Sequence, residues 1–175
     1  MAITKIQSES LNLADTYAFT GTVTGAGESN VPIFICSANT LTSQSNNTWI
    51  KIQLAGAILD TASGFDSTNY RYTPNVAGQY LVIAKARQYT SPGAANQLQQ
   101  ERLALYKNGS SIREQIGADR RDGSYPYAVD ALLQEVVELN GTSDYVEFYF
   151  KMTSTGQVNL DGGNTIFRIF YLAST

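Results

Sequence analysis

Apolar side chains recur at every second position in a series of short segments that begins near Trp49. Successive side chains of a β-strand point to opposite faces of a sheet, so this period of two predicts half-buried strands. Turn signals separate the segments, and that arrangement indicates an all-β sandwich or barrel. The predicted strands are Trp49–Leu54, Tyr80–Tyr89, Arg102–Tyr106, Ser111–Ile116, Ala131–Leu139, Tyr145–Met152 and Thr165–Leu172.

Two Asn-Gly pairs, at 108–109 and 140–141, predict hairpin turns, because both residue types tolerate the positive φ that a two-residue hairpin loop requires. The second pair is expected to join Ala131–Leu139 to Tyr145–Met152. A helix over residues 129–139 is the alternative, since leucine and valine also recur there at helical spacing. We predict a strand because the turn that follows implies hairpin pairing.

The last predicted strand is apolar on both faces. Ile166, Phe170 and Leu172 project to one side, and Phe167, Ile169 and Tyr171 project to the other. An antiparallel strand at the surface of a monomeric sandwich normally keeps one face in water. A subunit interface is therefore expected to cover one face, with a loop of the same chain as the alternative.

The first 29 residues differ from the rest of the chain. They hold a few apolar residues among many glycines and threonines and offer little core of their own. We predict an N-terminal arm over residues 1–29 that docks on another protein, followed by one globular domain over residues 30–175. The residues expected to anchor the arm are Leu11, Leu13, Tyr17 and Phe19.

The composition argues against nucleic-acid and membrane partners. The net charge is -3, so the chain has no overall field to attract phosphates. Its one basic pair, Arg120-Arg121, is flanked by Asp119 and Asp122 and is expected to be a solvated loop. No apolar run approaches the ~20 residues of a membrane span, and the N-terminus lacks the apolar stretch of a signal peptide. Charged residues make up only 15%, which suits a subunit that packs against copies of itself.

The chain has no histidine. This absence removes the Ser-His-Asp and Cys-His arrangements and the commonest general base. Cys36 lies in an apolar run and is expected to be a buried small hydrophobe. We therefore predict that the protein is not an enzyme. A glycan depolymerase that uses a carboxylate pair is the remaining enzymatic alternative, and its candidate residues are Asp119, Asp122, Glu135 and Glu147.

Cofactors are not expected. The segments 119–123 and 161–164 combine carboxylate or amide side chains with glycine, but neither matches a twelve-residue calcium loop. No phosphate-binding loop is present. Calcium stays possible, without any assigned ligand.

Several motifs, in order along the chain, resemble the C1q/TNF-like domain. An aromatic strand leads through a Pro-x-x-x-Gly-x-Tyr turn into a long strand, a hairpin follows, and an aromatic strand closes the domain. The motifs are Phe65-Asp66, Tyr70–Tyr80, Leu105–Gly109, Leu139–Phe148 and Phe167–Leu172. The glycine that the family usually has in the closing strand is absent here.

The resemblance implies a jelly roll of about ten strands that assembles as a homotrimer around an aromatic-lined axis. Some family members bind calcium near that axis, but no residue here matches those ligands. The residues expected at the trimer interface are Tyr145, Tyr149, Phe167, Ile169 and Tyr171.

The segment Leu11–Gly27 resembles the opening segment of structural proteins of marine bacteriophages, especially cyanophages. This resemblance implies a virion protein whose arm binds other virion proteins while its trimeric head points outward. The expected role is that of a tail or head fibre knob that attaches to a glycan or protein on the host surface. Tyr125 and Tyr127 are the candidate receptor contacts, because tyrosine combines a flat apolar face with a polar tip. A decoration protein that stabilises the capsid or tail without binding the host is the alternative.

Overall fold

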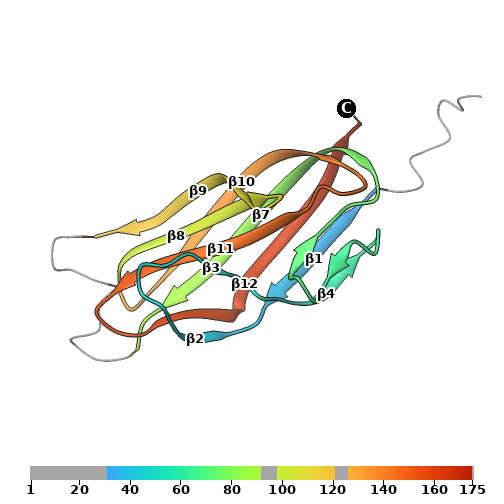
Figure 1. Ribbon diagram of the computed structural model, residues 1–175. Helices are drawn as coiled ribbons and strands as arrows, with labels where there is room; N and C mark the ends of the chain where they lie inside the picture. The colour runs from blue at the N-terminus through green and yellow to red at the C-terminus, as the bar shows by residue number, and fades with distance from the viewer. Residues whose placement is uncertain (1–30, 92–97, 121–125, 175) are drawn as a thin grey trace, which may run out of the picture.

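A computed structural model describes residues 31–91, 98–120 and 126–174 of the chain. These residues form two antiparallel sheets packed face to face, and no helix occurs among them (Figure 1). The predicted all-β sandwich is therefore confirmed.

The first sheet, here called sheet A, has the strand order β10-β7-β12-β1-β4, and β2 pairs with the start of β12. The alternating burial of its long strands shows that one face of the sheet is covered by the second sheet. Its strands are β1 (Ile33–Ala38), β2 (Leu41–Gln44), β4 (Leu54–Asp60), β7 (Ala77–Tyr89), β10 (Ala128–Asn140) and β12 (Val158–Ala173).

The second sheet, sheet B, has the order β5-β6-β11-β8-β9, and β3 pairs with β11. Strands β9 and β10 are thus the edges of the two sheets on the same side of the sandwich, where Arg113 Nε lies 3.6 Å from Glu135 Oε2. The strands of sheet B are β3 (Ile50–Lys51), β5 (Phe65–Asp66), β6 (Arg71–Tyr72), β8 (Leu98–Lys107), β9 (Ser110–Asp119) and β11 (Val146–Ser154).

The two Asn-Gly pairs form different connections. Asn108 and Gly109 have φ angles of 51° and 79° and join β8 to β9 as a hairpin, as predicted. Gly141 also has a positive φ, but the strand before it pairs with β7 in sheet A, whereas β11 pairs with β8 in sheet B. The predicted hairpin between residues 131–139 and 145–152 is therefore wrong. Residues 129–139 are nevertheless a strand, and the helical alternative is excluded.

Aromatic side chains from both sheets fill the core. Phe34 of sheet A stacks on Tyr72 of sheet B with ring centroids 4.5 Å apart, and Phe148 of sheet B stacks on Phe167 of sheet A at 4.2 Å. Tyr80 is fully buried, and its hydroxyl donates a hydrogen bond to the carbonyl oxygen of Val76. These contacts bury apolar surface between the two sheets. Removal of apolar surface from water is the dominant favourable contribution to folding.

Cys36 is fully buried, as the sequence predicted. Desolvation raises the pKa of its thiol from 9.0 to about 12. Because the thiolate is the reactive form, this cysteine is a chemically inert core residue.

Candidate assembly and recognition surfaces

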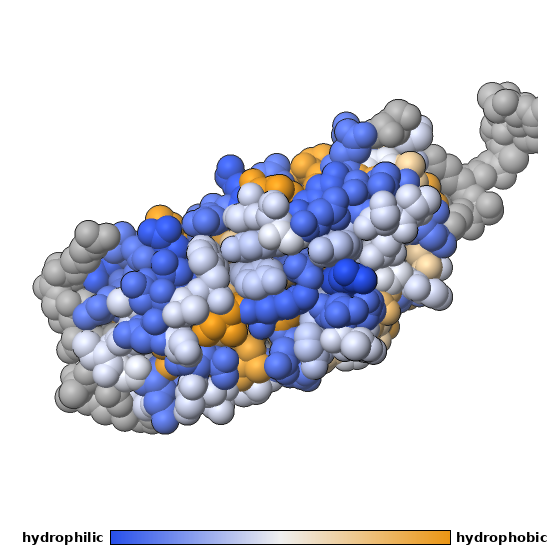
Figure 2. All heavy atoms as spheres, in the orientation of Figure 1, coloured by the Kyte–Doolittle hydropathy of each residue, from blue (hydrophilic) through white to orange (hydrophobic). Residues whose placement is uncertain are grey.

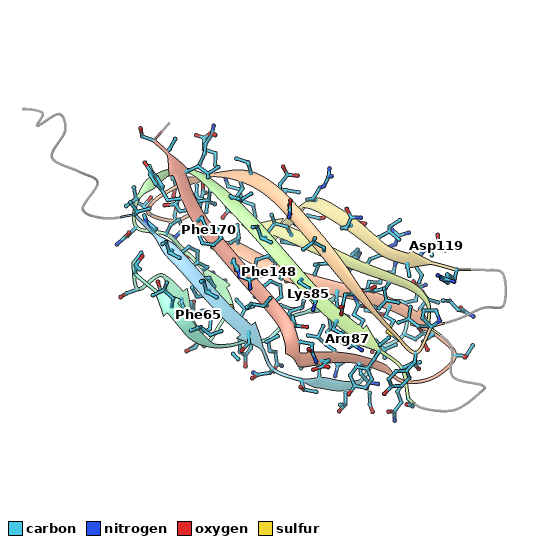
Figure 3. All side chains as sticks on the ribbon, turned by 180° about the vertical axis from the view of Figure 1, so that it is seen from behind. Phe65, Lys85, Arg87, Asp119, Phe148 and Phe170 are labelled. Atoms are coloured by element: carbon cyan, nitrogen blue, oxygen red, sulfur yellow. The ribbon has the colours of Figure 1, made fainter. Side chains whose placement is uncertain are left out.

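The outer face of sheet A carries a continuous row of apolar side chains. Leu81 of β7 lies opposite Val136 of β10 on one side and Phe170 of β12 on the other. Phe170 in turn lies opposite Ile33 of β1. Side chains opposite one another on one face of neighbouring strands are in contact. Val136 keeps 47% of its surface exposed, and Figure 3 looks onto this face, with Phe170 labelled on it. We call these four residues the apolar row.

The predicted trimer interface needs correction at Phe167 and Ile169. Both side chains have no exposed surface, because they point inward and sheet B covers them. Tyr171 also points inward, where its ring packs edge-on against Tyr80 at 5.4 Å. The alternation along β12 identified two apolar faces correctly, but the outward face is the one that contains Phe170.

Tyr145 and Tyr149 lie on the opposite side of the molecule, on the outer face of sheet B. Tyr149 packs on Tyr106 with centroids 4.1 Å apart, and the Arg71 guanidinium lies 4.5 Å from the centroid of the Tyr145 ring. The five predicted interface residues therefore do not share one surface. In the view of Figure 2, hydrophilic and intermediate residues cover most of the surface, and hydrophobic residues form only small patches.

The edge of sheet B offers a second apolar surface. Within the described part of the chain, strand β9 pairs only with β8, and nearly all of its side chains are exposed. Ile112 and Ile116 on this strand each expose 44% of their surface. An exposed edge strand with large aliphatic side chains is a typical site of contact with another chain.

A shallow pocket of about 330 Å³ lies at the end of sheet A that is remote from the apolar row. Its described lining residues come from three segments that are distant in sequence: Arg87 and Tyr89 of β7, Tyr127 just before β10, and Asp161 of β12. Tyr127, one of the two predicted receptor contacts, is 49% exposed there. Tyr125 lies outside the described residues, as do the arm residues Leu11, Leu13, Tyr17 and Phe19.

The strand register explains how this pocket forms. Arg87 lies opposite Asp161, and Tyr89 lies opposite both Asn159 and Ala128. Immediately after Asp161 the pairing of β12 with β7 shifts and resumes only at Ile166. Such bulges re-aim side chains and are frequent beside functional sites. Tyr127 was predicted as a receptor contact from its residue type, whereas the position of the other three residues beside it follows only from the pairing of β7 with β12.

Glu101 is a carboxyl group inside the core. It has no exposed surface, and its Oε1 accepts a hydrogen bond from Gln88 Nε2 at 3.0 Å. Burial raises the pKa of this carboxyl from 4.5 to about 8, with a further contribution from the charge of Asp130. A raised pKa is typical of catalytic acids, but this group has no surface that a substrate could reach.

The predicted depolymerase carboxylates do not converge in the described part of the chain. Glu135 belongs to sheet A and is paired with Arg113, whereas Glu147 belongs to sheet B and is paired with Lys51. Asp122 lies outside the described residues. No group of three cysteine, aspartate or glutamate side chains suited to a metal ion occurs in residues 31–91, 98–120 and 126–174. Nor does any helix in those residues have the length and hydropathy to cross a membrane.

No protein-family model matches the sequence, and no curated protein matches it either. Solved structures do match. An Eiger TNF from S. frugiperda superposes with a TM-score of 0.60 at 10% identity, over 83% of this chain and 94% of that one. The fold is a TNF/C1q-like jelly roll. Murine APRIL, at a TM-score of 0.57 and 10% identity, covers 82% of this chain and 100% of its own.

The globular domain of zebrafish complement 1qA superposes with a TM-score of 0.56 at 16% identity, over 83% of this chain and all of that one. These matches confirm the jelly roll that the sequence motifs indicated. At such low identity they establish the fold alone, because one fold hosts many unrelated functions.

Proposed function

We propose that this protein is a trimeric, non-enzymatic display domain of a bacteriophage particle and that it attaches the particle to the host surface. The observation that carries the proposal is the apolar row on the outer face of sheet A. Val136, Leu81, Phe170 and Ile33 form a stripe across four strands that the chain's own second sheet does not cover. Val136 is exposed and the other three are half-buried, and apolar side chains that reach the surface next to one another mark a contact with another molecule.

The two apolar surfaces favour a ring of identical subunits over a two-fold dimer. The apolar row lies on the face of sheet A, and Ile112 and Ile116 lie on the edge of sheet B. When one patch of a subunit binds a different patch of the next subunit, every copy can use both of its patches. The copies then form a closed ring if the rotation between neighbouring subunits returns to the first one. A trimer is the ring that the resemblance of the sequence motifs to the C1q/TNF-like domain implies.

A binding role is better supported than an enzymatic one. The chain has no histidine, its buried acid Glu101 is inaccessible, and its predicted carboxylate candidates lie on different sheets or form ion pairs. The pocket at Arg87, by contrast, is open to solvent and lined by aromatic and polar groups. That combination is typical of a small recognition site.

The phage assignment depends on the resemblance of residues 11–27 to the opening segment of marine phage structural proteins. In the proposal, the arm binds other virion proteins and the jelly roll points outward. The protein is then located on the virion, and the arm carries it there.

An experiment on particles tests this role. An antibody against the jelly roll is expected to label purified particles of the phage that encodes the chain. Pre-incubation of host cells with the purified protein is expected to reduce adsorption of those particles. Labelling without any effect on adsorption would favour the decoration alternative, and unlabelled particles would contradict the virion assignment.

A further inference from the structure

We propose that the pocket formed by Arg87, Tyr89, Tyr127 and Asp161 binds a neutral sugar unit. The inference rests on the proposed attachment role, because it names the chemical class of the surface ligand. A cavity of about 330 Å³ is at the small end of the ~300–1,000 Å³ range of ligand sites, and a single sugar ring is a ligand of that class.

The aromatic wall has the geometry of a stacking platform. The Tyr89 and Tyr127 ring centroids lie 6.0 Å apart, and the ring planes meet at 48°. The two rings therefore pack against each other and form one aromatic surface of the pocket. The C–H face of a sugar ring is apolar, and a tyrosine ring combines a flat apolar face with a hydroxyl that can hydrogen-bond.

The other two lining residues, Arg87 and Asp161, supply hydrogen-bonding groups suited to hydroxyls. Arg87 Nε lies 3.9 Å from Asp161 Oδ2, and Arg87 Nη1 lies 3.8 Å from Asp130 Oδ1. At these distances the Arg87 guanidinium and the two carboxylates attract each other as ion pairs. They are too far apart for a hydrogen bond, which requires roughly 2.7–3.2 Å between donor and acceptor. A guanidinium only donates and a carboxylate only accepts. Neighbouring sugar hydroxyls, each both donor and acceptor, satisfy both groups at once.

The charge balance at the pocket selects a neutral ligand. Arg87 and the adjacent Lys85 carry positive charge, and Asp130 and Asp161 carry negative charge, with Lys85 Nζ 3.4 Å from Asp130 Oδ2. Two cations facing two carboxylates leave no net field for a phosphate, sulfate or carboxylate ligand. Aromatic and hydrogen-bonding contacts therefore determine what binds.

The backbone behind the pocket is fixed before any ligand arrives. The Arg87 N–H donates to Thr165 Oγ1 at 3.1 Å, and that hydroxyl donates to the Asp161 carbonyl at 2.7 Å. The Thr90 N–H donates to the Tyr127 carbonyl at 3.0 Å, which ties the segment before β10 to the end of β7. Asn164 donates to both oxygens of the Asp161 carboxylate. A preorganised site loses less conformational entropy when it binds.

The pocket is separate from the proposed assembly surface. Arg87 and Leu81 of the apolar row are six positions apart on β7, which corresponds to roughly 20 Å at the rise of an extended strand. Figure 3 shows Arg87 and Phe170 towards opposite ends of sheet A. Burial of the apolar row in an assembly is therefore compatible with an open pocket.

Saturation-transfer NMR with the full chain tests the inference. The probes are methyl glycosides of glucose, galactose, mannose, fucose, rhamnose and N-acetylglucosamine, with the anionic methyl glycoside of N-acetylneuraminic acid for comparison. At least one neutral glycoside is expected to receive saturation, and more strongly than the anionic one. Because Tyr127→Ala removes one of the two rings of the aromatic surface, the variant is expected to weaken binding about tenfold, which corresponds to about 1.4 kcal/mol.

Two variants make the result specific to the pocket. Tyr127→Phe keeps the ring and is expected to retain most of the binding. Leu132→Ala removes a similarly exposed side chain of β10 outside the pocket lining and is expected to leave binding unchanged. No transfer to any neutral glycoside, preference for the anionic one, or equal binding by Tyr127→Ala would overturn the inference. Light scattering on the same samples reports the oligomer independently, so failure of sugar binding and failure of assembly are distinguishable.

Discussion

Glu101 shows how one buried residue links the core to pH. Its Oε1 accepts a hydrogen bond from Gln88 Nε2, the backbone of Ala131 also interacts with the carboxyl, and its Oε2 lies against Gly117. Burial is the largest influence on its pKa and the charge of Asp130 raises it further, and these two effects outweigh the hydrogen bonds with Ala131 and Gln88, which lower it. The carboxyl is therefore neutral in the folded protein at pH 7, because its pKa is raised to about 8.

This carboxyl is expected to make the fold less stable as pH rises. Between its ordinary pKa of 4.5 and its folded pKa of about 8, the unfolded chain releases the proton and the folded chain keeps it. The contribution of Glu101 to the free energy of unfolding is complete below pH 4.5. It is lost as the pH rises from 4.5 to about 8, by up to about 1.4 kcal/mol per pH unit. Urea unfolding of the wild type and Glu101→Gln at pH 5 and pH 8 measures the effect. The free energy of unfolding of the glutamine variant is expected to differ less between pH 5 and pH 8 than that of the wild type. An equal difference in both proteins would contradict the assignment.

At the scale of elements, local patterns predicted strands well and their partners poorly. The dipeptide Asn-Gly reports a local preference for positive φ. The pair at 108–109 lies in a hairpin that joins β8 to β9, whereas the pair at 140–141 lies at the connection from β10 of sheet A to β11 of sheet B. The pairing of β7 with β10, which runs from Ala77 to Tyr89, joins segments about fifty residues apart that carry no mutual signal in the sequence. The same limit hid which apolar face of β12 meets sheet B.

The start of β7 depends on a close approach to β12 that only glycine permits. Gly78 has a φ of 155°, and a Cβ there would overlap the Ala173 carbonyl oxygen and the ring of Tyr171. We expect Gly78→Ala to lower the free energy of unfolding by about 1–3 kcal/mol, because it combines steric overlap with an unfavourable φ. Gly56→Ala is the matched control, since nothing lies within 4 Å of its added Cβ. Thermal melts compare the two variants, and equal melting temperatures would contradict the proposed approach.

For the whole molecule, the sequence motifs predicted the jelly roll, and the strand pairing showed which side chains lie together on its candidate surfaces. Tyr127 was predicted from residue type, but Arg87 and Asp161 meet only because β7 and β12 pair in one register. Phe167 and Ile169 were assigned to an interface because both faces of β12 are apolar, and the second sheet covers that face instead. Sites built from distant strands become visible only when the register is known.

The central claim is that the apolar row joins copies of this chain into a trimer. Light scattering of the purified chain, whose mass is 19.1 kDa, measures this directly. We expect the mass of three chains for the wild type and for Ile58→Asp, which changes an exposed isoleucine outside the row. Val136→Asp buries a charge at the proposed contact, so we expect its mass to fall to that of one chain. A wild type with the mass of one chain, or a Val136→Asp variant that stays trimeric, would contradict the account.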